Sequence, residues 1–224
     1  MESLGIGLDW RWDFALTVLP QLLPALGITL QATVLGMVLA LLLGLGWALL
    51  RRSDNRVLTT VSHWIVEFTR STPLLVQLYF LFFVLPEIGV RFSPMVTGVV
   101  ALGLHYSAYT AEVYRAGIEH VPRQQWEAAI ALNLSRRDTW LRVVLPQALP
   151  PIIPALGNYL IAMLKDTPML AAITVLELLQ TAKLIGAEQF RYLEPLTLVG
   201  LLFLLISLTA SFALRRLEAR FGTL

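Results

Sequence analysis

The chain has 224 residues, of which 57% are hydrophobic and 14% charged, with a formal net charge of +2. Soluble domains carry about 25% charged residues, so this composition excludes an ordinary soluble domain and indicates a membrane protein. The small net charge gives no indication of nucleic-acid binding, and the absence of cysteine excludes disulfides, cysteine metal ligands and thiol nucleophiles.

Five apolar spans are expected along the chain. Four runs without Asp, Glu, Lys or Arg reach the roughly 20 residues that a helix needs to cross hydrocarbon, and a fifth, shorter run becomes a full span when Glu67 and Arg70 are included. The spans are expected to be helices, because backbone amides in lipid must be bonded internally and the strict alternation of a membrane barrel is absent. The fold class is therefore all-α and integral to a membrane, with spans at 22–50, 57–85, 95–114, 150–169 and 193–214.

An external N-terminal segment, residues 1–21, is expected before the first span. It starts MESLGIGLDWRWD, with three acids and one arginine, whereas a signal peptide starts with a basic region, so the first span itself is expected to direct insertion. Within this span Gly27, Gly36, Gly44 and Gly46 suit close helix contacts, although glycine is also frequent in transmembrane helices generally.

The basic residues of the loops predict the orientation. Eleven Lys and Arg residues follow the first, third and fifth spans, whereas four lie in the alternate loops. Because short cytoplasmic loops carry the excess of Lys and Arg, we expect the N-terminus outside and the C-terminus in the cytoplasm, with residues 217–224 as a cytoplasmic tail. The segment between the third and fourth spans, about residues 115–149, is then cytoplasmic.

This central segment predicts a helix, a sharp turn and a second helix. Residues 123–132 are rich in helix formers, Asn133 tolerates the left-handed conformation that ends helices, and Ser135-Arg-Arg-Asp138 has the pattern of a capping box. The second helix is expected to stop before Leu145-Pro146. From composition two interpretations stay open: an amphipathic helix on the membrane surface, or a peg whose small alanines and Glu127 dock into a partner's groove.

The stretch EAAIALNLSRRDTWLRVVLPQALP resembles the EAA loop of ATP-binding cassette (ABC) importer permeases. That loop reads EAA, a Gly after three more residues, and I-x-LP after nine more; here Glu127-Ala128-Ala129 and Leu145-Pro146 match, and Asn133 stands at the Gly position. RSTPLLVQL, YTAEVYRAG and Lys165-Asp166-Thr167 resemble the polar amino-acid subfamily. LHYSAYTAEVYRAGI and MLKDTPMLAAITVLELLQTAK resemble its ectoine/hydroxyectoine branch. The resemblance covers residues 22–216.

The resemblance implies a type I importer (MetI-like) transmembrane domain over residues 22–216, in the bacterial inner membrane. In this family the EAA helix sits in a cleft of the ATPase subunit, and closure of the ATPase dimer on ATP switches the pathway. The coupling residues so implied are Glu127, Ala128, Ala129, Asn133, Arg136, Leu145 and Pro146.

The resemblance also implies the partners. They are an ATPase dimer, an external solute-binding protein, the lipid bilayer and a second permease subunit, with a paralogue favoured over an identical copy; no nucleic acid is expected. No cofactor is expected on this chain, since ATP and Mg²⁺ are used by the partner ATPase. The chain has no GxxxxGK[ST] phosphate loop, so it is expected to be non-catalytic.

Ionisable groups inside the spans are costly in lipid and are therefore candidates for function. Glu67 with Arg70, and Glu112 with Arg115, are spaced to pair on one helix face, with a structural ion pair as the alternative role. Thr72-Pro73 predicts a kink, and Lys165 and Asp166 each need a partner elsewhere because adjacent residues do not face each other. The candidates to line a pathway or gate for a zwitterionic solute are Glu67, Arg70, Thr72, Gln77, Tyr109, Glu112, Lys165, Asp166 and Thr167. No metal site is expected, because the three histidines share no ligand spacing.

The function expected is that of a permease subunit in an ATP-driven importer of a small zwitterionic or amino-acid-like solute, with ectoine or hydroxyectoine favoured by the resemblance. Glutamine, glutamate, arginine or histidine are the alternative solutes. A gated channel or an ion-coupled secondary carrier is a further alternative. Five spans, a docking loop and the absence of an internal repeat argue against the carrier. A membrane scaffold that transports nothing has no use for the EAA loop.

Overall fold

The structure is a computed structural model that describes residues 9–221, and this part of the chain is helical without a strand. The prediction of an all-α fold is confirmed. The elements are α1 (Trp12–Leu50), α2 (Arg56–Ser71), α3 (Leu74–Tyr79), η1 (Phe80–Val84), η2 (Leu85–Ile88), α4 (Pro94–Glu119), α5 (Arg123–Ala131), α6 (Arg136–Asp138), η3 (Thr139–Val144), α7 (Leu145–Asp166), η4 (Thr167–Ile173), α8 (Leu178–Glu188) and α9 (Leu193–Phe221). Of the short elements, η1 and η3 are π-helical and η2 and η4 are 3₁₀-helical.

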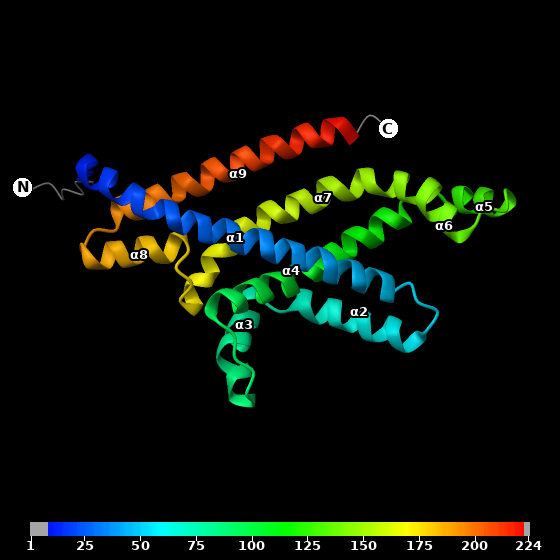
Figure 1. Cartoon of the computed structure of the whole chain (residues 1–224), viewed down its shortest axis with the longest axis horizontal. Helices are drawn as coiled ribbons and strands as arrows, with labels where there is room; N and C mark the ends of the chain where they lie inside the picture. Colours follow the sequence, from blue (N-terminus) through cyan, green and yellow to red (C-terminus); the bar gives the residue numbers. More distant parts are fainter. Residues whose placement is uncertain (1–8, 222–224) are drawn as a thin grey trace, which may run out of the picture.

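Each expected span contains a helix, but not every helix is equally apolar. Three helical stretches in residues 9–221 are long and apolar enough to cross a membrane, Trp12–Leu50, Arg136–Ile173 and Leu193–Ala219, and a bent pair starting at Arg56 makes a fourth if it counts as one span. α4 has 26 residues but is more polar. α4 packs against α1, α2 and α7 (Figure 1). Because less of its surface faces lipid, fewer of its side chains have to be apolar. The count of five spans and their orientation stay predictions.

α1 starts earlier than the expected first span. Residues 12–21, expected to be a segment ahead of the span, are helical, and Pro20 and Pro24 lie inside the helix. The backbone N–H of Arg11 donates to the carboxylate of Glu194 at 3.1 Å, and the guanidinium of Arg191 holds the same carboxylate at 2.5 Å. Glu194 is fully buried. These contacts fasten the start of α1 to the start of α9, so tertiary packing outweighs the helix-breaking tendency of the prolines.

The contact between α1 and α4 forms the centre of the fold. Gly36 packs against Leu102, and Gly44 lies directly against Thr110 and the carbonyl of Ser107. The hydroxyl of Thr110 donates to the carbonyl oxygen of Ala40 at 2.8 Å, so the two backbones are close enough for a side chain of one helix to bond the main chain of the other. Two of the four predicted contact glycines therefore mediate helix packing, whereas Gly27 and Gly46 face open space.

The second expected span is broken, as Thr72-Pro73 predicts. α2 and the following stretch from Leu74 are bent by 104°. Pro73 has no N–H for the carbonyl of Thr69, and the side-chain amide of Gln77 donates to that carbonyl instead, at 2.8 Å. The break is therefore closed by a specific polar contact.

The prediction that a helix stops before Leu145-Pro146 is wrong. From Arg136 the chain runs through α6 and the π-helical η3 directly into α7, which continues past Pro146, Pro150, Pro151 and Pro154. The N–H of Leu145 donates to the carbonyl of Trp140, one residue further back than in an α-helix. This wider turn accommodates the first proline ring, because the ring clash that ends a helix arises in the α-helical register.

The segment of α5 and α6, which carries most of the predicted coupling residues, and α8 lie at opposite ends of the long axis (Figure 1). α5 and α6 form one end, beyond the ends of α1 and α4, and α8 packs beside the starts of α1 and α9 at the other. This arrangement is the one expected for segments on opposite sides of a membrane.

Gly44 and Gly46 provide a matched test of the α1–α4 contact. Gly44→Ala places a methyl group against Thr110 and 2.8 Å from the carbonyl oxygen of Ser107, so we expect destabilisation by about 1–3 kcal/mol. Gly46→Ala meets nothing within 4 Å and replaces a poor helix former, so it should be neutral or stabilising by up to about 1 kcal/mol. Thermal unfolding of the purified protein in nanodiscs measures both, and equal effects would contradict this packing.

Candidate functional site

The predicted peg is a short exposed helix at one end of the molecule. α5 has nine residues and is preceded by Pro122. Glu127 is 62% exposed on its side chain, with Arg123 one turn earlier at 3.1 Å, while Ala129 is buried at 2%. Such an exposed pair is weak, so Glu127 exchanges partners at little cost. α5 therefore presents Glu127 and Ala128 outward and packs inward through Ala129.

Asn133 ends this helix in the predicted way. Its φ is +49°, in the left-handed region where glycine and asparagine are favoured. The N–H of Leu134 donates to the carbonyl of Ala129 at 3.0 Å, and the N–H of Asn133 donates to Ile130 at 2.9 Å. This pattern satisfies the carbonyls at the helix end and reverses the chain within a few residues.

The second helix begins at the predicted cap. The hydroxyl of Ser135 accepts from the N–H of Asp138 at 3.1 Å and donates to its carboxylate at 2.6 Å. Arg136 lies in the first turn, exposed, whereas Leu145 and Pro146 lie further along, at the start of α7. The predicted coupling residues thus form an exposed group around the turn and a second pair at its base.

Sequence reasoning missed two features of this segment. Ile130 and Leu132 are 75% and 73% exposed at the tip, an apolar surface next to Glu127. Trp126 and Trp140 meet edge to face, with ring centroids 5.4 Å apart, and pack on a buried cluster that contains Ile118. The exposed apolar tip could have been predicted, because Ile130 and Leu132 lie within the EAA stretch. The contact of the two tryptophans could not, because it depends on the fold of the turn.

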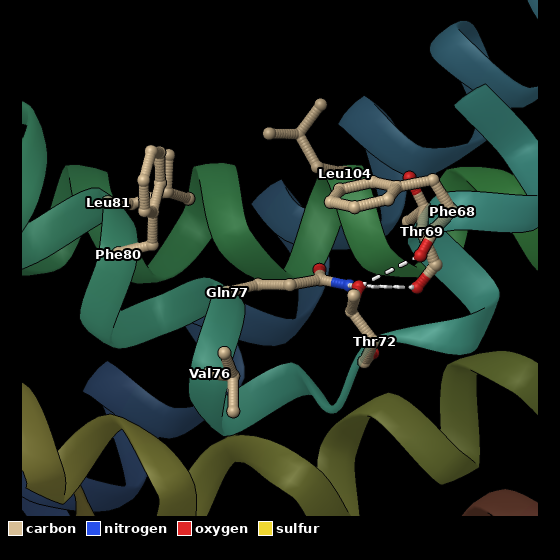
Figure 2. Close-up of a pocket in the computed structure, with 8 residues that line it drawn as sticks. All are labelled: Phe68, Thr69, Thr72, Val76, Gln77, Phe80, Leu81 and Leu104. Atoms are coloured by element: carbon tan, nitrogen blue, oxygen red, sulfur yellow. Dashed lines mark hydrogen bonds between the residues drawn. The ribbon is translucent and has the colours of Figure 1, made fainter. Parts of the chain in front are cut away.

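At the break between α2 and α3, Thr72 and Gln77 line a cavity of about 360 Å³ (Figure 2). The amide of Gln77 also donates to the hydroxyl and the carbonyl of Thr72, at 2.7 and 3.1 Å. The other lining residues are mainly apolar: Phe68, Thr69, Val76, Phe80, Leu81 and Leu104. The side chain of Gln77 points into the break, where its amide bonds the broken end of α2.

A cluster of tyrosines joins the predicted charged residues of three helices. Glu67 and Arg70 form the expected pair on α2, at 3.6 Å, and the guanidinium of Arg70 lies 5.6 Å from the ring centroid of Tyr109 on α4. Tyr106 donates to the carboxylate of Asp166 on α7 at 2.7 Å. Both rings lie near Tyr159, with centroids 6.2 and 5.5 Å away. Asp166 was expected to need a partner other than its neighbour Lys165, and Tyr106 is that partner.

The remaining pathway candidates lie apart from this cluster. Lys165 is exposed and lines a hollow of about 290 Å³ beside α9, which includes Ser207. Thr167 is fully buried and its hydroxyl donates to the carbonyl of Leu164 at 2.7 Å. Glu112 bonds Arg115 at 2.7 Å and also pairs with Arg51 at the end of α1, so it joins α4 to α1.

At the opposite end, α8 starts at a buried carboxylate. Glu177 is fully buried and accepts from the N–H groups of Leu179 and Gln180, at 2.9 and 2.7 Å. Burial raises the pKa of Glu177 above its ordinary value of 4.5, against the opposing effect of these two bonds and of the nearby Lys183. The N–H of Leu178 donates to the hydroxyl of Thr29 on α1, so the start of α8 is fixed by its cap and by α1. Glu177 therefore helps to fix the position of α8.

Three comparisons bear on this arrangement. Residues 36–223 match the family described as binding-protein-dependent transport system inner membrane component. A probable amino-acid ABC transporter permease of Sinorhizobium fredii is 47% identical over 213 residues, which are 92% of each chain. The glutamine transport system permease GlnP of Escherichia coli K12 is 35% identical, covering 95% of this chain and 98% of GlnP.

Solved structures agree with the fold. The structure described as an amino acid ABC transporter with histidines superposes with a TM-score of 0.90 at 33% identity, covering 95% of this chain and 100% of that one. An inward-facing MetNI methionine ABC transporter superposes with a TM-score of 0.70 at 20% identity, which supports the fold alone.

The family match covers most of the chain, the chain aligns with its relatives over nearly their whole length, and the helical arrangement is shared with a solved structure. The chain belongs to the family of amino-acid ABC transporter permeases, the inner membrane components of binding-protein-dependent transport systems.

Proposed function

We propose that this permease couples to its ATPase through α5 and the turn after it. The observation that carries the proposal is the exposed tip: Glu127, Ala128 and Ile130 on α5 and Leu132 directly after it are all exposed, and the helix is ended by a left-handed Asn133. An acid flanked by apolar groups fits a groove that offers a basic residue and an apolar floor. Arg136 lies beyond the turn, and Leu145-Pro146 joins this unit to α7.

The partners follow from this proposal. An ATPase dimer uses ATP and Mg²⁺ on the side of α5, while this chain holds no cofactor and performs no hydrolysis. A solute-binding protein meets the opposite end, near α8. A second permease subunit, a paralogue by preference, completes the pathway, and the remaining apolar faces contact the lipid of the bacterial inner membrane. In this proposal the chain crosses the membrane five times, and the basic residues of the loops favour an N-terminus outside.

The solute proposed is small, zwitterionic and amino-acid-like. Arg70 offers a cation for a carboxylate, and Asp166 offers an anion for an ammonium group; the tyrosine cluster between α4 and α7 joins them. Aromatic rings also attract cations, which favours a solute with a positive nitrogen. Ectoine fits this description, and so do glutamine and histidine; the relatives are named for glutamine and, in Bacillus subtilis, L-cystine. Competition among these solutes for uptake separates the candidates.

Glu127→Arg tests the coupling role. Reversal of this charge opposes a basic partner and removes a charge-assisted bond of about 1.5–3 kcal/mol, so solute-stimulated ATP hydrolysis and uptake should fall tenfold or more. Both are measured in the complete complex reconstituted in liposomes.

Gln125→Arg is the matched control. It adds a positive charge on the same exposed helix, two residues from Glu127 and therefore about 200° around the axis. We expect this variant to retain uptake. Unchanged ATP hydrolysis in Glu127→Arg would show that α5 does not dock as proposed, and uptake without ATP would favour a secondary carrier.

Arg70→Gln and Asp166→Asn test the solute pathway. Asparagine can still accept the bond from Tyr106, so Asp166→Asn removes the charge and leaves the local contact. Each variant should lower uptake of a zwitterionic solute about tenfold, because a hydrogen bond to a charged group contributes about 1.5–3 kcal/mol. Arg91→Gln, on an exposed residue before α4, is the control. Wild-type uptake in both pathway variants would exclude this pair from the pathway.

A further inference from the structure

Two adjacent arginines at the end of α1 contact different elements. Arg51 pairs with Glu112, which lies on α4. The guanidinium carbon of Arg52 lies 5.8 Å from the ring centroid of Trp126 on α5 and 5.6 Å from that of Trp140 on η3. The short segment after α1 therefore connects to the end of α4 through one residue and to the peg through the next.

The tryptophan pair offers two aromatic faces to which a guanidinium can bind. The two rings meet at an interplanar angle of 85°, so they form a corner, and one planar cation lies within reach of both faces. Leu49 and Asp54, on either side of Arg52, line the same hollow of about 510 Å³ as Trp126 and Trp140. Arg52 thus crosses a hollow between the α1–α2 segment and the peg.

Besides Arg52, two residues hold α5 against the rest of the chain: Ala129, its one buried residue, and Trp126, which packs on the buried cluster of Ile118. The exposed pair of Arg123 and Glu127 lies within the helix itself. Trp126 directly precedes Glu127, and neighbouring residues on a helix are about 100° apart around the axis. A contact that fixes the side of Trp126 therefore fixes the direction in which Glu127 projects.

We propose that Arg52 is a positioning residue that sets the orientation of α5 and links its movement to α1 and α4. The link runs from α5 through Trp126 and Trp140 to Arg52, and through the neighbouring Arg51 to Glu112. Movement of the peg is thereby transmitted to the two helices at the centre of the fold through Trp140 at the start of η3, without passing along α7. This inference rests on the proposed docking of α5 to the ATPase.

The first experiment measures the orientation itself. In the assembled complex, hydrogen exchange of the amides of residues 123–134 should accelerate about tenfold in Arg52→Gln, because α5 loses a contact that holds it against the rest of the chain. Arg52→Lys keeps a cation near the rings and should lie between Arg52→Gln and the wild type. Arg56→Gln, at the exposed first residue of α2, should leave the exchange unchanged.

The second experiment measures coupling. Arg52→Gln should raise the ATP hydrolysed per solute transported at least threefold, with assembly and the KM for solute unchanged, and Arg52→Lys should restore part of the ratio. Trp126→Leu removes the other side of the contact, and its effect should not add to that of Arg52→Gln, because both remove the same interaction.

The outcomes separate this proposal from the docking proposal. If Glu127→Arg leaves ATP hydrolysis intact, docking of α5 is wrong whatever Arg52 does. If Glu127→Arg uncouples the complex while Arg52→Gln matches the wild type in exchange and in ATP per solute, the Arg52 link is wrong. Fully additive effects of Arg52→Gln and Trp126→Leu also overturn it, as does loss of assembly in Arg52→Gln, which would assign the residue to assembly.

Discussion

Backbone groups inside a bilayer must be hydrogen-bonded within the protein, and this constraint shapes the chain wherever a helix is interrupted. At Pro73 the carbonyl of Thr69 loses its main-chain donor, and the amide of Gln77 takes its place. At the start of α7, in the segment expected to be cytoplasmic, the π-helical turn likewise shifts the main-chain bonds by one residue, and the amide of Gln147 donates to the carbonyl of Val143 at 2.7 Å. At these two places a nearby side chain or a change of register supplies a hydrogen bond where a proline interrupts the regular pattern.

The same constraint divides the polar residues of the spans into two groups. Gln77 and Thr167 bond backbone carbonyls near them, and Glu112 joins two helices through arginines, so the structure accounts for these side chains without a solute. Arg70 and Asp166 differ, since each has an aromatic neighbour: Arg70 lies by Tyr109 as well as pairing with Glu67, and Asp166 accepts from Tyr106. In the pathway proposed above, weakly held charges suit transport, because a solute must leave as readily as it enters.

The sequence predicted local features well and distant contacts poorly. Asn133 in the left-handed turn, the cap at Ser135 and the pair of Glu67 with Arg70 depend on residues within a few positions, and all three are present. The continuation of a helix through Pro146, the start of α1 at Trp12 and the contact of Tyr106 with Asp166 depend on packing between segments far apart in the chain. Residues that disfavour a helix locally, such as proline, are therefore weak predictors of where a helix ends, because tertiary packing overrides local propensity.

Distance along the chain also explains why the position of Arg52 was not predicted. Basic residues after an apolar span indicate orientation, and that role accounts for Arg51, Arg52 and Arg56 equally. Only the fold distinguishes them, because it brings Glu112 to one and a corner of two tryptophans to the next. Arginines that are equivalent as orientation signals therefore differ in their contacts, and the contacts of Arg52 are the ones that reach the segment proposed to meet the ATPase.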